Sequence, residues 1–413
     1  MTRRGANQPS VGGYNEALVL DQVRRSGGLS RVELAGKTGL SSQTVSNITQ
    51  RLLDAGIIEP GGRVAGRGLP AGPGKPRTIL RLVPTSRYAI GVHLDPSVLT
   101  VALLAIDGTV VTSRSRATPS ANDPTRTIHL ITQQIDLLLD DTGVYRDRIV
   151  GIGIAAPGPI DAERGVIVDP PNLDGWHRVP LRDAIAERTG LPVALDKDVT
   201  AAAVAELWLA ADTTTTNFVF LYLGTGVGMG LVIDGEVARG SSGNAGEVGH
   251  IVVDPDGPPC PCGQRGCVAV SCTPAALVEE AESLGILPGA RTRRDPATMD
   301  AAFSSLVDLA AAQHPGAAGV LTRCGQRITH ALAVVCDLLD VDRVIVGGPL
   351  WGRLSTWFEH HVFDSLGAQL VTRDIHPIVV TGTTLGKDVG AIGAASIILD
   401  EALAPRPTSL LLT

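Results

Sequence analysis

The sequence predicts a small, mainly helical N-terminal domain of the winged helix-turn-helix class, followed by a larger α/β body of two lobes. Three observations predict this fold class. A chain of 413 residues is too long for one ordinary core. Two short amphipathic helices separated by Gly-Leu-Ser stand near its start, and strand and helix patterns alternate from Tyr88 onward. We expect domains at residues 1–84 and 85–400, with a C-terminal tail at 401–413.

Local signals define three helices in the N-terminal domain. Residues Tyr14 to Arg25 place their apolar side chains on one side, which is typical of an amphipathic first helix. Ser30 is placed to cap a second helix that ends at Gly39, and Ser41 to cap a third. An apolar repeat at i, i+3 and i+7 predicts the buried side of this third helix: Val45, Ile48 and Leu52.

The outer side of the third helix carries hydroxyl and amide groups. These are Ser42, Gln43, Thr44, Ser46, Asn47 and, further along, Gln50. Residues near the start of a recognition helix reach base edges in the major groove, and Gln and Asn can bind adenine bidentately. Any surface helix is polar on its outer side, so the pattern alone is ambiguous. The helix-turn-helix context favours DNA binding by the first five.

A basic loop follows and is predicted to form the wing. Residues 61–77 are rich in glycine and proline and precede a strand-like run from Thr78 to Val83. The loop carries four cations: Arg63, Arg67, Lys75 and Arg77. A plain linker would need fewer cations, so we expect these side chains to contact phosphates or the minor groove of double-stranded DNA.

Charge is divided unevenly along the chain. Residues 1–86 carry a net charge of +7, whereas the remainder carries −14. A basic head on an acidic body indicates that the head alone meets a polyanion. Aromatic residues make up only 3% of the chain, which disfavours stacking platforms for single-stranded nucleic acid. The sequence shows neither an apolar signal core nor a membrane-spanning stretch, so we expect a cytoplasmic, nucleoid-associated protein.

The body begins with three consecutive strand patterns, followed by a helix and a further strand. Their bounds are Ala89 to Leu94, Thr100 to Ile106, Thr109 to Arg114, Thr127 to Leu139 and Ile149 to Ile154. Later, strands at Phe218 to Leu223 and Gly230 to Ile233 flank the glycine run 224–230. This run returns to a strand, so it is not a dinucleotide fingerprint. An anion nest and a purely steric tight turn both remain open for it.

Three cysteines and a histidine stand close together between Gly246 and Cys267. The set is His250, Cys260, Cys262 and Cys267. Three thiolates and one imidazole fill all four positions of a tetrahedral zinc ion, which indicates a structural site and not a hydrolytic one. Buried cysteines or a disulfide are the alternatives, and a disulfide is disfavoured in a chain with no secretory signal.

The run Gly246-Glu247-Val248-Gly249-His250, followed by Cys-x-Cys-Gly-x-x-Gly-Cys, resembles the signature of the ROK family. The name of that family stands for repressors, open reading frames and kinases. The resemblance extends from about Tyr14 to about Leu399 and implies an actin/hexokinase-like (ribonuclease H-like) fold for the body. It leaves open whether the chain is a sugar kinase or a sugar-responsive repressor.

The first phosphate loop of the body departs from the pattern of the family's active kinases. Those kinases carry Asp-x-Gly-Gly-Thr-Lys at the position where this chain has His93-Leu94-Asp95-Pro96. Asp95 adds a negative charge beside the expected triphosphate, and Pro96 removes an N–H donor. We therefore expect that the chain is not an ATP-dependent enzyme and has no catalytic residue, although Asp198 matches the position of the family's base.

The resemblance implies that the sugar side of the site is better retained. Two loops look like the family's substrate loops, and they contain Gly158 and Asn172. The segment 196–201 aligns with the family's Glu-Asn-Asp-Ala-Asn-Ala, with Lys197 in place of its asparagine. The expected effector-binding residues are Gly158, Asn172, Lys197, Asp198, Glu247 and His250. Lys197 either supplies charge for an acidic or modified sugar or pairs with Asp196 or Asp198.

These features favour a DNA-binding transcriptional regulator, most simply a repressor, controlled by a sugar-like effector and stabilised by structural zinc. Two half-sites require two heads, so we expect a homodimer or tetramer. The alternative is a ROK-family sugar kinase with an accessory DNA-binding head, which the altered phosphate loop disfavours. A zinc hydrolase is disfavoured because all four metal positions are filled.

Overall fold

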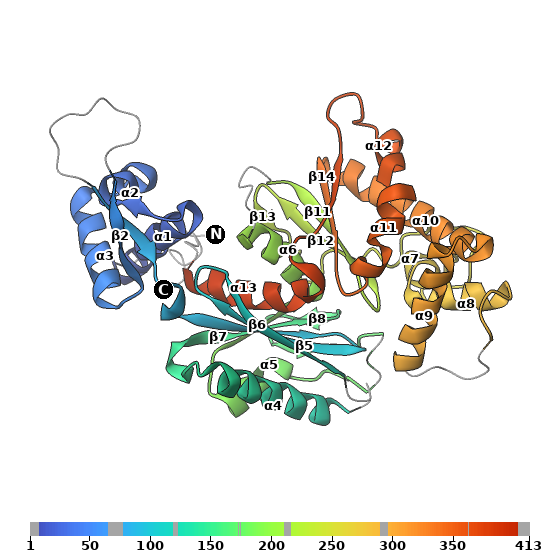
Figure 1. Ribbon diagram of the computed structural model, residues 1–413, viewed down its shortest axis with the longest axis horizontal. Helices are drawn as coiled ribbons and strands as arrows, with labels where there is room; N and C mark the ends of the chain where they lie inside the picture. Colours follow the sequence, from blue (N-terminus) through green and yellow to red (C-terminus); the bar gives the residue numbers. More distant parts are fainter. Residues whose placement is uncertain are drawn as a thin grey trace.

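The computed structural model describes residues 8–64, 77–118, 123–171, 173, 175–209, 216–289, 296–361 and 363–403. The N-terminal head lies at one end of a two-lobed body, and the last helix of the chain runs between the lobes (Figure 1). Among the described residues, no helix is long and apolar enough to cross a membrane.

The head consists of three helices and a three-stranded antiparallel sheet of order β1-β3-β2. Its elements are α1 (Gln8–Ser26), β1 (Leu29–Ser30), α2 (Arg31–Thr38), α3 (Ser42–Asp54), β2 (Ile58–Val64) and β3 (Arg77–Leu82). Ser30 and Glu33 form a capping box at α2, and Ser41 caps α3, as the sequence predicts. The first helix begins at Gln8, earlier than the predicted Tyr14, and its second half contributes Val19, Leu20 and Val23 to the head core.

The first lobe is built on a five-stranded sheet of order β10-β7-β4-β5-β6. Its elements are η1 (Pro84–Ser86), β4 (Tyr88–Leu94), β5 (Val98–Ala105), β6 (Val110–Ala117), α4 (Pro124–Thr142), η2 (Arg146–Arg148), β7 (Ile149–Ala156), β8 (Ile160–Asp161), β9 (Val166–Ile167), α5 (Leu181–Thr189) and β10 (Val193–Lys197). Helices α4 and α5 cover one face of the sheet (Figure 1). All predicted strands of this lobe are present.

The second lobe contains a five-stranded sheet of order β13-β12-β11-β14-β15 and a cluster of helices. Its strands are β11 (Phe218–Leu223), β12 (Val227–Ile233), β13 (Glu236–Val237), β14 (Arg343–Gly347) and β15 (Val379–Gly382). Its helices are α7 (Val268–Ser271), α8 (Pro274–Ser283), α9 (Pro296–Ala311), α10 (Pro315–Leu339), α11 (Trp351–His361), η3 (Phe363–Ser365), α12 (Leu366–Gln369) and η4 (Gly386–Asp388). Residues 224–226 of the glycine run turn the chain between two antiparallel strands, so the predicted strand-to-strand turn is confirmed. Strand β12 begins at Val227, three residues before the predicted Gly230.

Two helices form the layer between the sheets: α6 (Asp198–Leu209) and α13 (Val389–Leu403). Their close packing depends on glycine. A Cβ atom at Gly91, Gly153 or Gly393 would lie 1.8–1.9 Å from a backbone oxygen of the neighbouring helix. The small residues at the start of α13 therefore serve close packing. Helix α13 continues to Leu403, so the predicted tail at 401–413 begins inside this helix.

Candidate functional site

The four predicted metal ligands lie together in one loop of the second lobe. Their ligand atoms all lie within 4.8 Å of one another. Sγ of Cys262 lies 3.7 Å from Sγ of Cys267, and Sγ of Cys260 lies 3.5 Å from Nδ1 of His250. Bonds of about 2.0–2.3 Å to one tetrahedral ion separate the ligands by about 3.5–3.8 Å, whereas a disulfide needs about 2.05 Å. The cluster can therefore hold a metal ion.

An ionic network fixes this metal loop to the helices of the second lobe. Arg327 on α10 donates to Oδ2 of Asp254 at 2.6 Å and to Oε2 of Glu280 at 3.1 Å. A Cβ atom at Gly266 would lie 1.5 Å from the carbonyl oxygen of Asp254, so the loop folds back tightly on itself. The position of the loop is thus determined by both backbone packing and charge.

Three predicted effector-binding residues meet where the two lobes face each other, a region that we call the cleft. Nζ of Lys197, at the end of β10, donates to Oε1 of Glu247 at 2.5 Å and to the carbonyl oxygen of Ala245 at 3.2 Å. A Cβ atom at Gly158 would lie 3.0 Å from both Cε of Lys197 and Oε1 of Glu247. Because Gly158 has no side chain, the ion pair can lie directly against its backbone.

One of the two roles expected for Lys197, an ion pair with Asp196 or Asp198, is wrong. Lys197 pairs with Glu247, not with Asp196 or Asp198. Asp196 accepts instead from Nε of Arg239 at 2.8 Å and from the backbone N–H of Lys197 at 2.9 Å. Strand β10 directs Lys197 across the cleft, so its nearest acid is one from the facing lobe and not a neighbour in sequence.

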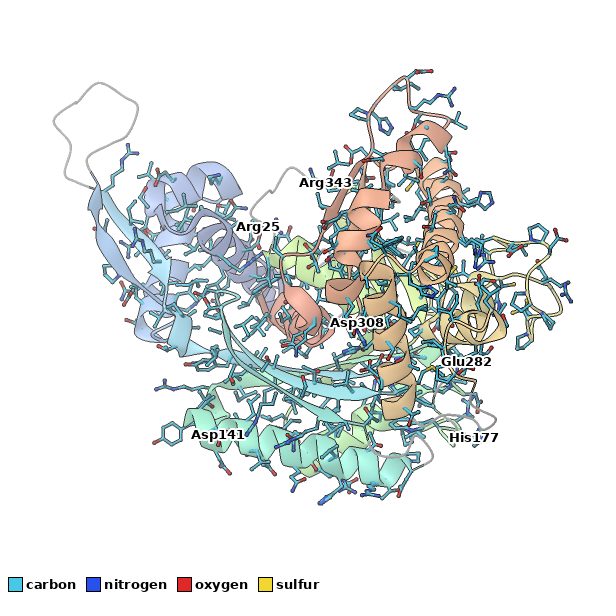
Figure 2. The ribbon with its side chains drawn as sticks, turned by 45° about the vertical axis from the view of Figure 1, so that its right-hand side comes forward. Arg25, Asp141, His177, Glu282, Asp308 and Arg343 are labelled. Atoms are coloured by element: carbon cyan, nitrogen blue, oxygen red, sulfur yellow. The ribbon has the colours of Figure 1, made fainter. Side chains whose placement is uncertain are left out.

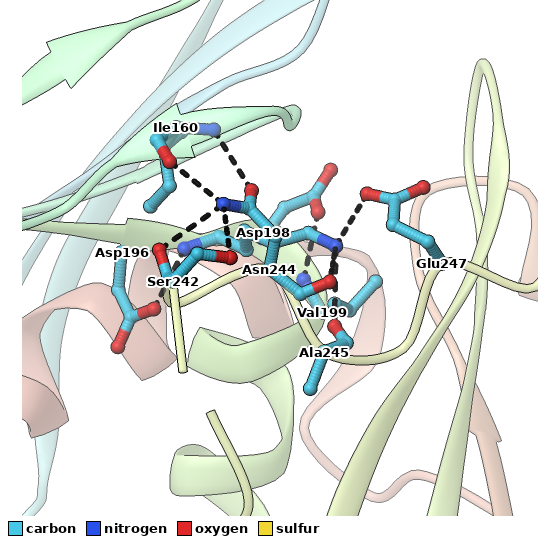
Figure 3. Close-up of polar contacts among 9 residues, drawn as sticks. Ile160, Asp196, Asp198, Val199, Ser242, Asn244, Ala245 and Glu247 are labelled. Carbon is cyan, nitrogen blue, oxygen red and sulfur yellow. Dashed lines mark hydrogen bonds and ion pairs between the residues drawn. The ribbon is translucent and has the colours of Figure 1, made fainter. Parts of the chain in front are cut away.

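Asn244 is a cleft residue that the sequence analysis missed. Its Nδ2 donates to the carbonyl oxygen of Ile160 at 2.7 Å, and its Oδ1 accepts from the backbone N–H of Ile160 at 2.8 Å. Figure 3 shows the dashed contacts that join this side chain to Ile160 and Ser242. An asparagine within the glycine-rich run before Glu247 was the available signal.

Asp198, the first residue of α6, has an unusual protonation equilibrium. Burial among packed groups raises its pKa to about 7, and the charges of Asp95 and Glu247 add to the increase. The backbone N–H of Val199, at 2.7 Å, and the ammonium of Lys197 oppose this shift. Near neutral pH this carboxyl group can therefore either accept or donate a hydrogen bond.

Two further residues were predicted to bind the effector, Asn172 and His250. Asn172 lies outside the described residues. His250 lies three residues after Glu247 and belongs to the metal cluster. The loop from Glu247 to His250 therefore links the cleft to the metal cluster.

The altered phosphate loop joins the two lobes. Oδ1 of Asp95 accepts from Oγ1 of Thr225, in the second glycine loop, at 2.8 Å, and from the backbone N–H of Ser97 at 2.8 Å. Nε2 of His93 lies 3.0 Å from the hydroxyl of Tyr222 on β11. His93, Asp95 and Tyr222 are all buried, and burial lowers the pKa of His93. Polar side chains thus bridge the lobes at this loop.

The predicted DNA-contacting side chains of α3 lie on its outer side. Ser42, Gln43 and Asn47 are exposed, whereas Thr44 and Ser46 are half-buried. Nε2 of Gln43 donates to Oδ1 of Asn47 at 3.0 Å. Of the predicted wing cations, Arg77 is the first residue of β3 and is exposed. Arg67, Lys75 and the side chain of Arg63, a residue of β2, lie outside the described residues.

Comparison with known proteins gives two family matches. Residues 89–401 match the ROK family, and residues 17–59 match the winged helix-turn-helix DNA-binding family. The chain is 24% identical to the xylose repressor of Bacillus subtilis over 96% of this chain and 98% of that one. It is 31% identical to the glucokinase of Thermotoga maritima over 76% of this chain and 97% of that one. Repressors and kinases therefore both occur among its named relatives.

A solved structure reproduces the whole architecture. It is a ROK family transcriptional regulator described as a homolog of the E. coli MLC protein, and it superposes with a TM-score of 0.72 at 22% identity. The match covers 95% of this chain and 98% of the chain in that structure. The family matches, the two lobes and the metal cluster all point to the same family. The chain therefore belongs to the ROK family and carries a winged helix-turn-helix head.

Proposed function

We propose that this protein is a sequence-specific DNA-binding repressor whose body binds a sugar-like effector. The proposal rests on two features found together: a helix-turn-helix head, and a phosphate loop whose own side chains connect it to the facing lobe. The full-length similarity to a protein named xylose repressor supports it. The head, at residues 1–84, binds the operator, and the body, at residues 85–400, binds the effector.

The recognition helix α3 reads the operator through Ser42, Gln43, Thr44, Ser46 and Asn47. The exposure of Gln43 and Asn47 supports this role, because amide side chains at the start of such a helix can reach base edges. The wing cations Arg63, Arg67, Lys75 and Arg77 contact phosphates. A homodimer or tetramer supplies two heads for two half-sites.

The effector lies in the cleft beside Gly158, Lys197, Asp198 and Glu247, and we also assign Asn172 and His250 to its binding. Hydrogen-bond donors and acceptors from both lobes converge there, which suits the hydroxyl groups of a sugar. The Lys197 ammonium is already paired with Glu247. This pairing supports a neutral, hydroxyl-rich effector over an acidic one, because an acidic ligand would have to displace Glu247.

The body does not phosphorylate its ligand. Asp95 presents a carboxylate to Thr225 in the glycine loop, where a nucleotide phosphate would need donors and positive charge. Its burial and its three hydrogen bonds, two from Ser97 and one from Thr225, keep it in place. A coupled ATPase assay with each candidate sugar tests this inference, and sugar-dependent turnover would favour the kinase alternative.

The metal is zinc in a structural role. His250, Cys260, Cys262 and Cys267 supply the nitrogen and three sulfur ligands that zinc prefers, and four protein ligands leave no position for a reacting water. When bound, zinc would hold this loop in a fixed shape. Because the loop starts next to Glu247, the ion supports the cleft without taking part in chemistry.

Fluorescence anisotropy on the protein's own upstream DNA tests the proposed function. Full-length protein is titrated at fixed salt with and without xylose, glucose, N-acetylglucosamine and their phosphates. We expect specific binding that one sugar relieves, and the paired variant Gln43→Ala with Asn47→Ala should lose the preference for that DNA over random DNA. Equal binding to both DNAs by the unmutated protein contradicts the proposal.

A further inference from the structure

The head is anchored on the C-terminal end of α6. Nη1 of Arg24, on α1, donates to the carbonyl oxygen of Trp208 at 2.8 Å. The guanidinium carbon of Arg24 lies 4.0 Å from the centroid of the Trp208 ring. The Arg24 side chain is only 8% exposed and pairs with Asp21 at 2.9 Å. A desolvated guanidinium held over an indole ring is a strong and orientation-dependent contact.

A second contact joins the head to the end of α13. Leu403 packs against the head core and also against the apolar cluster between the lobes. Figure 1 shows the end of α13 close to the head. In Figure 2, Arg25 lies where the head meets the body, whereas His177 and Glu282 lie at the far end. Both interlobe helices therefore end at the head.

The other ends of these helices lie at the cleft. Helix α6 begins with Asp198, and α13 begins beside His93, whose ring would lie 2.8 Å from a Cβ atom at Gly390. The ten residue-to-residue steps from Asp198 to Trp208 span about 15 Å at 1.5 Å per residue. A single continuous helix thus links the cleft to the residue on which Arg24 is anchored.

Helix α6 has little room to bend or shift within its surroundings. A Cβ atom at Gly393 would lie 1.9 Å from the carbonyl oxygen of Ala201, and one at Gly230 would lie 2.3 Å from that of Val199. Thr383 donates to the buried Glu206 near the end of the helix. Packing this close passes a displacement on to neighbouring elements instead of absorbing it.

We propose that α6 transmits the state of the effector cleft to the DNA-binding head, and that Arg24 and Trp208 are the positioning residues that make this connection. The proposal rests on the proposed function, because it concerns how effector binding reaches the DNA. A shift of α6 at Asp198 moves Trp208, and Arg24 moves α1 with it. The orientation of the recognition helix, and with it the spacing of paired heads, changes in response.

Hydrogen exchange of the full-length protein tests the anchoring. Arg24→Ala is compared with the matched control Arg25→Ala, because Arg25 is its neighbour on α1, pairs with the same Asp21 and is half-exposed. We expect amide exchange in α1 to rise about tenfold or more in Arg24→Ala but not in Arg25→Ala. Arg24→Lys, which keeps a cation over the ring, should recover part of the protection. Equal exchange in the two alanine variants overturns the anchoring.

The transmission is tested by a perturbation at the other end of the helix. Asp198→Asn keeps the shape of the side chain and its hydrogen bond to Val199 but removes the charge. We expect this change to alter exchange in α1 by about fivefold or more in the wild-type background and not in Arg24→Ala. The same change in both backgrounds, or none in either, overturns the transmission. Neither result depends on a sugar or an operator, so this proposal and the proposed function fail separately.

Discussion

The Lys197–Glu247 pair predicts that its two halves contribute unequally to stability. The side chain of Lys197 is 3% exposed, whereas that of Glu247 is 59% exposed. Removing Glu247 leaves a buried ammonium whose remaining acceptors are two carbonyl oxygens, at 3.2 and 3.5 Å. Removing the ammonium leaves a carboxylate that water can solvate. Glu247→Ala should therefore cost more than Lys197→Met, in which the apolar stem of the side chain is retained.

The structure sets the size of this difference. Breaking a fully buried ion pair from one side costs about 3–5 kcal/mol. Water screens the exposed carboxylate and the carbonyl oxygens still accept from the ammonium, so we expect about 2 kcal/mol for Glu247→Ala. Lys197→Met should cost less than about 1 kcal/mol. With about 2 °C per kcal/mol for a large domain, the midpoint of the body's thermal transition falls by about 4 °C in the first variant and under 2 °C in the second.

Thermal unfolding followed by circular dichroism measures both variants, the double variant and Glu247→Gln. The double variant should be close to Lys197→Met, because the cost of Glu247→Ala comes from the ammonium it leaves behind. Glu247→Gln should fall between wild type and Glu247→Ala, since its amide oxygen can still accept. An equal or larger loss in Lys197→Met would show that the ammonium is satisfied without Glu247 and would refute the reasoning.

Three further changes have definite expected outcomes. Cys262→Ser should lose bound zinc, counted by atomic spectroscopy, whereas Cys336→Ser, outside the cluster, should retain it. Burial raises the pKa of Asp198 to about 7, so the folded state binds the carboxyl proton more tightly than the unfolded state does. The stabilisation that this proton gives is therefore lost as pH rises from about 4 to about 7. The thermal midpoint of Asp198→Asn should lack this pH dependence when it is compared with that of the wild type. Asn47→Ala should weaken specific DNA binding in anisotropy titrations by about 1–3 kcal/mol, and Gln50→Ala, further along α3, by much less.

Local signals made much of the fold predictable from sequence. The caps at Ser30 and Ser41 involve neighbours three residues away, and the strand at Phe218–Leu223 is a continuous apolar run, so each could be recognised within a short window. The metal cluster was equally accessible because three of its ligands lie within eight residues of one another. These interactions depend little on how the lobes pack.

The contacts that determine the cleft could not be predicted in this way. Lys197 and Glu247 are 50 residues apart, Ile160 and Asn244 are 84 apart, and Arg24 and Trp208 are 184 apart. Each contact exists because two separately folded elements meet, and the sequence near either partner gives no sign of the other. One of the two roles expected for Lys197, a pair with Asp196 or Asp198, was wrong for this reason, since it considered only near neighbours.

The phosphate loop shows how one fold can serve either catalysis or regulation. A kinase needs this part of the cleft to open, admit a nucleotide and close around it. In this chain His93 contacts Tyr222 and Asp95 contacts Thr225, so side chains already bridge the lobes where phosphates would lie. On the proposed function, lobe movement then responds to the effector on the sugar side of the cleft. Because α6 begins on that side and ends under Arg24, we infer that binding energy which a kinase would use to position phosphate is used here to reorient the head.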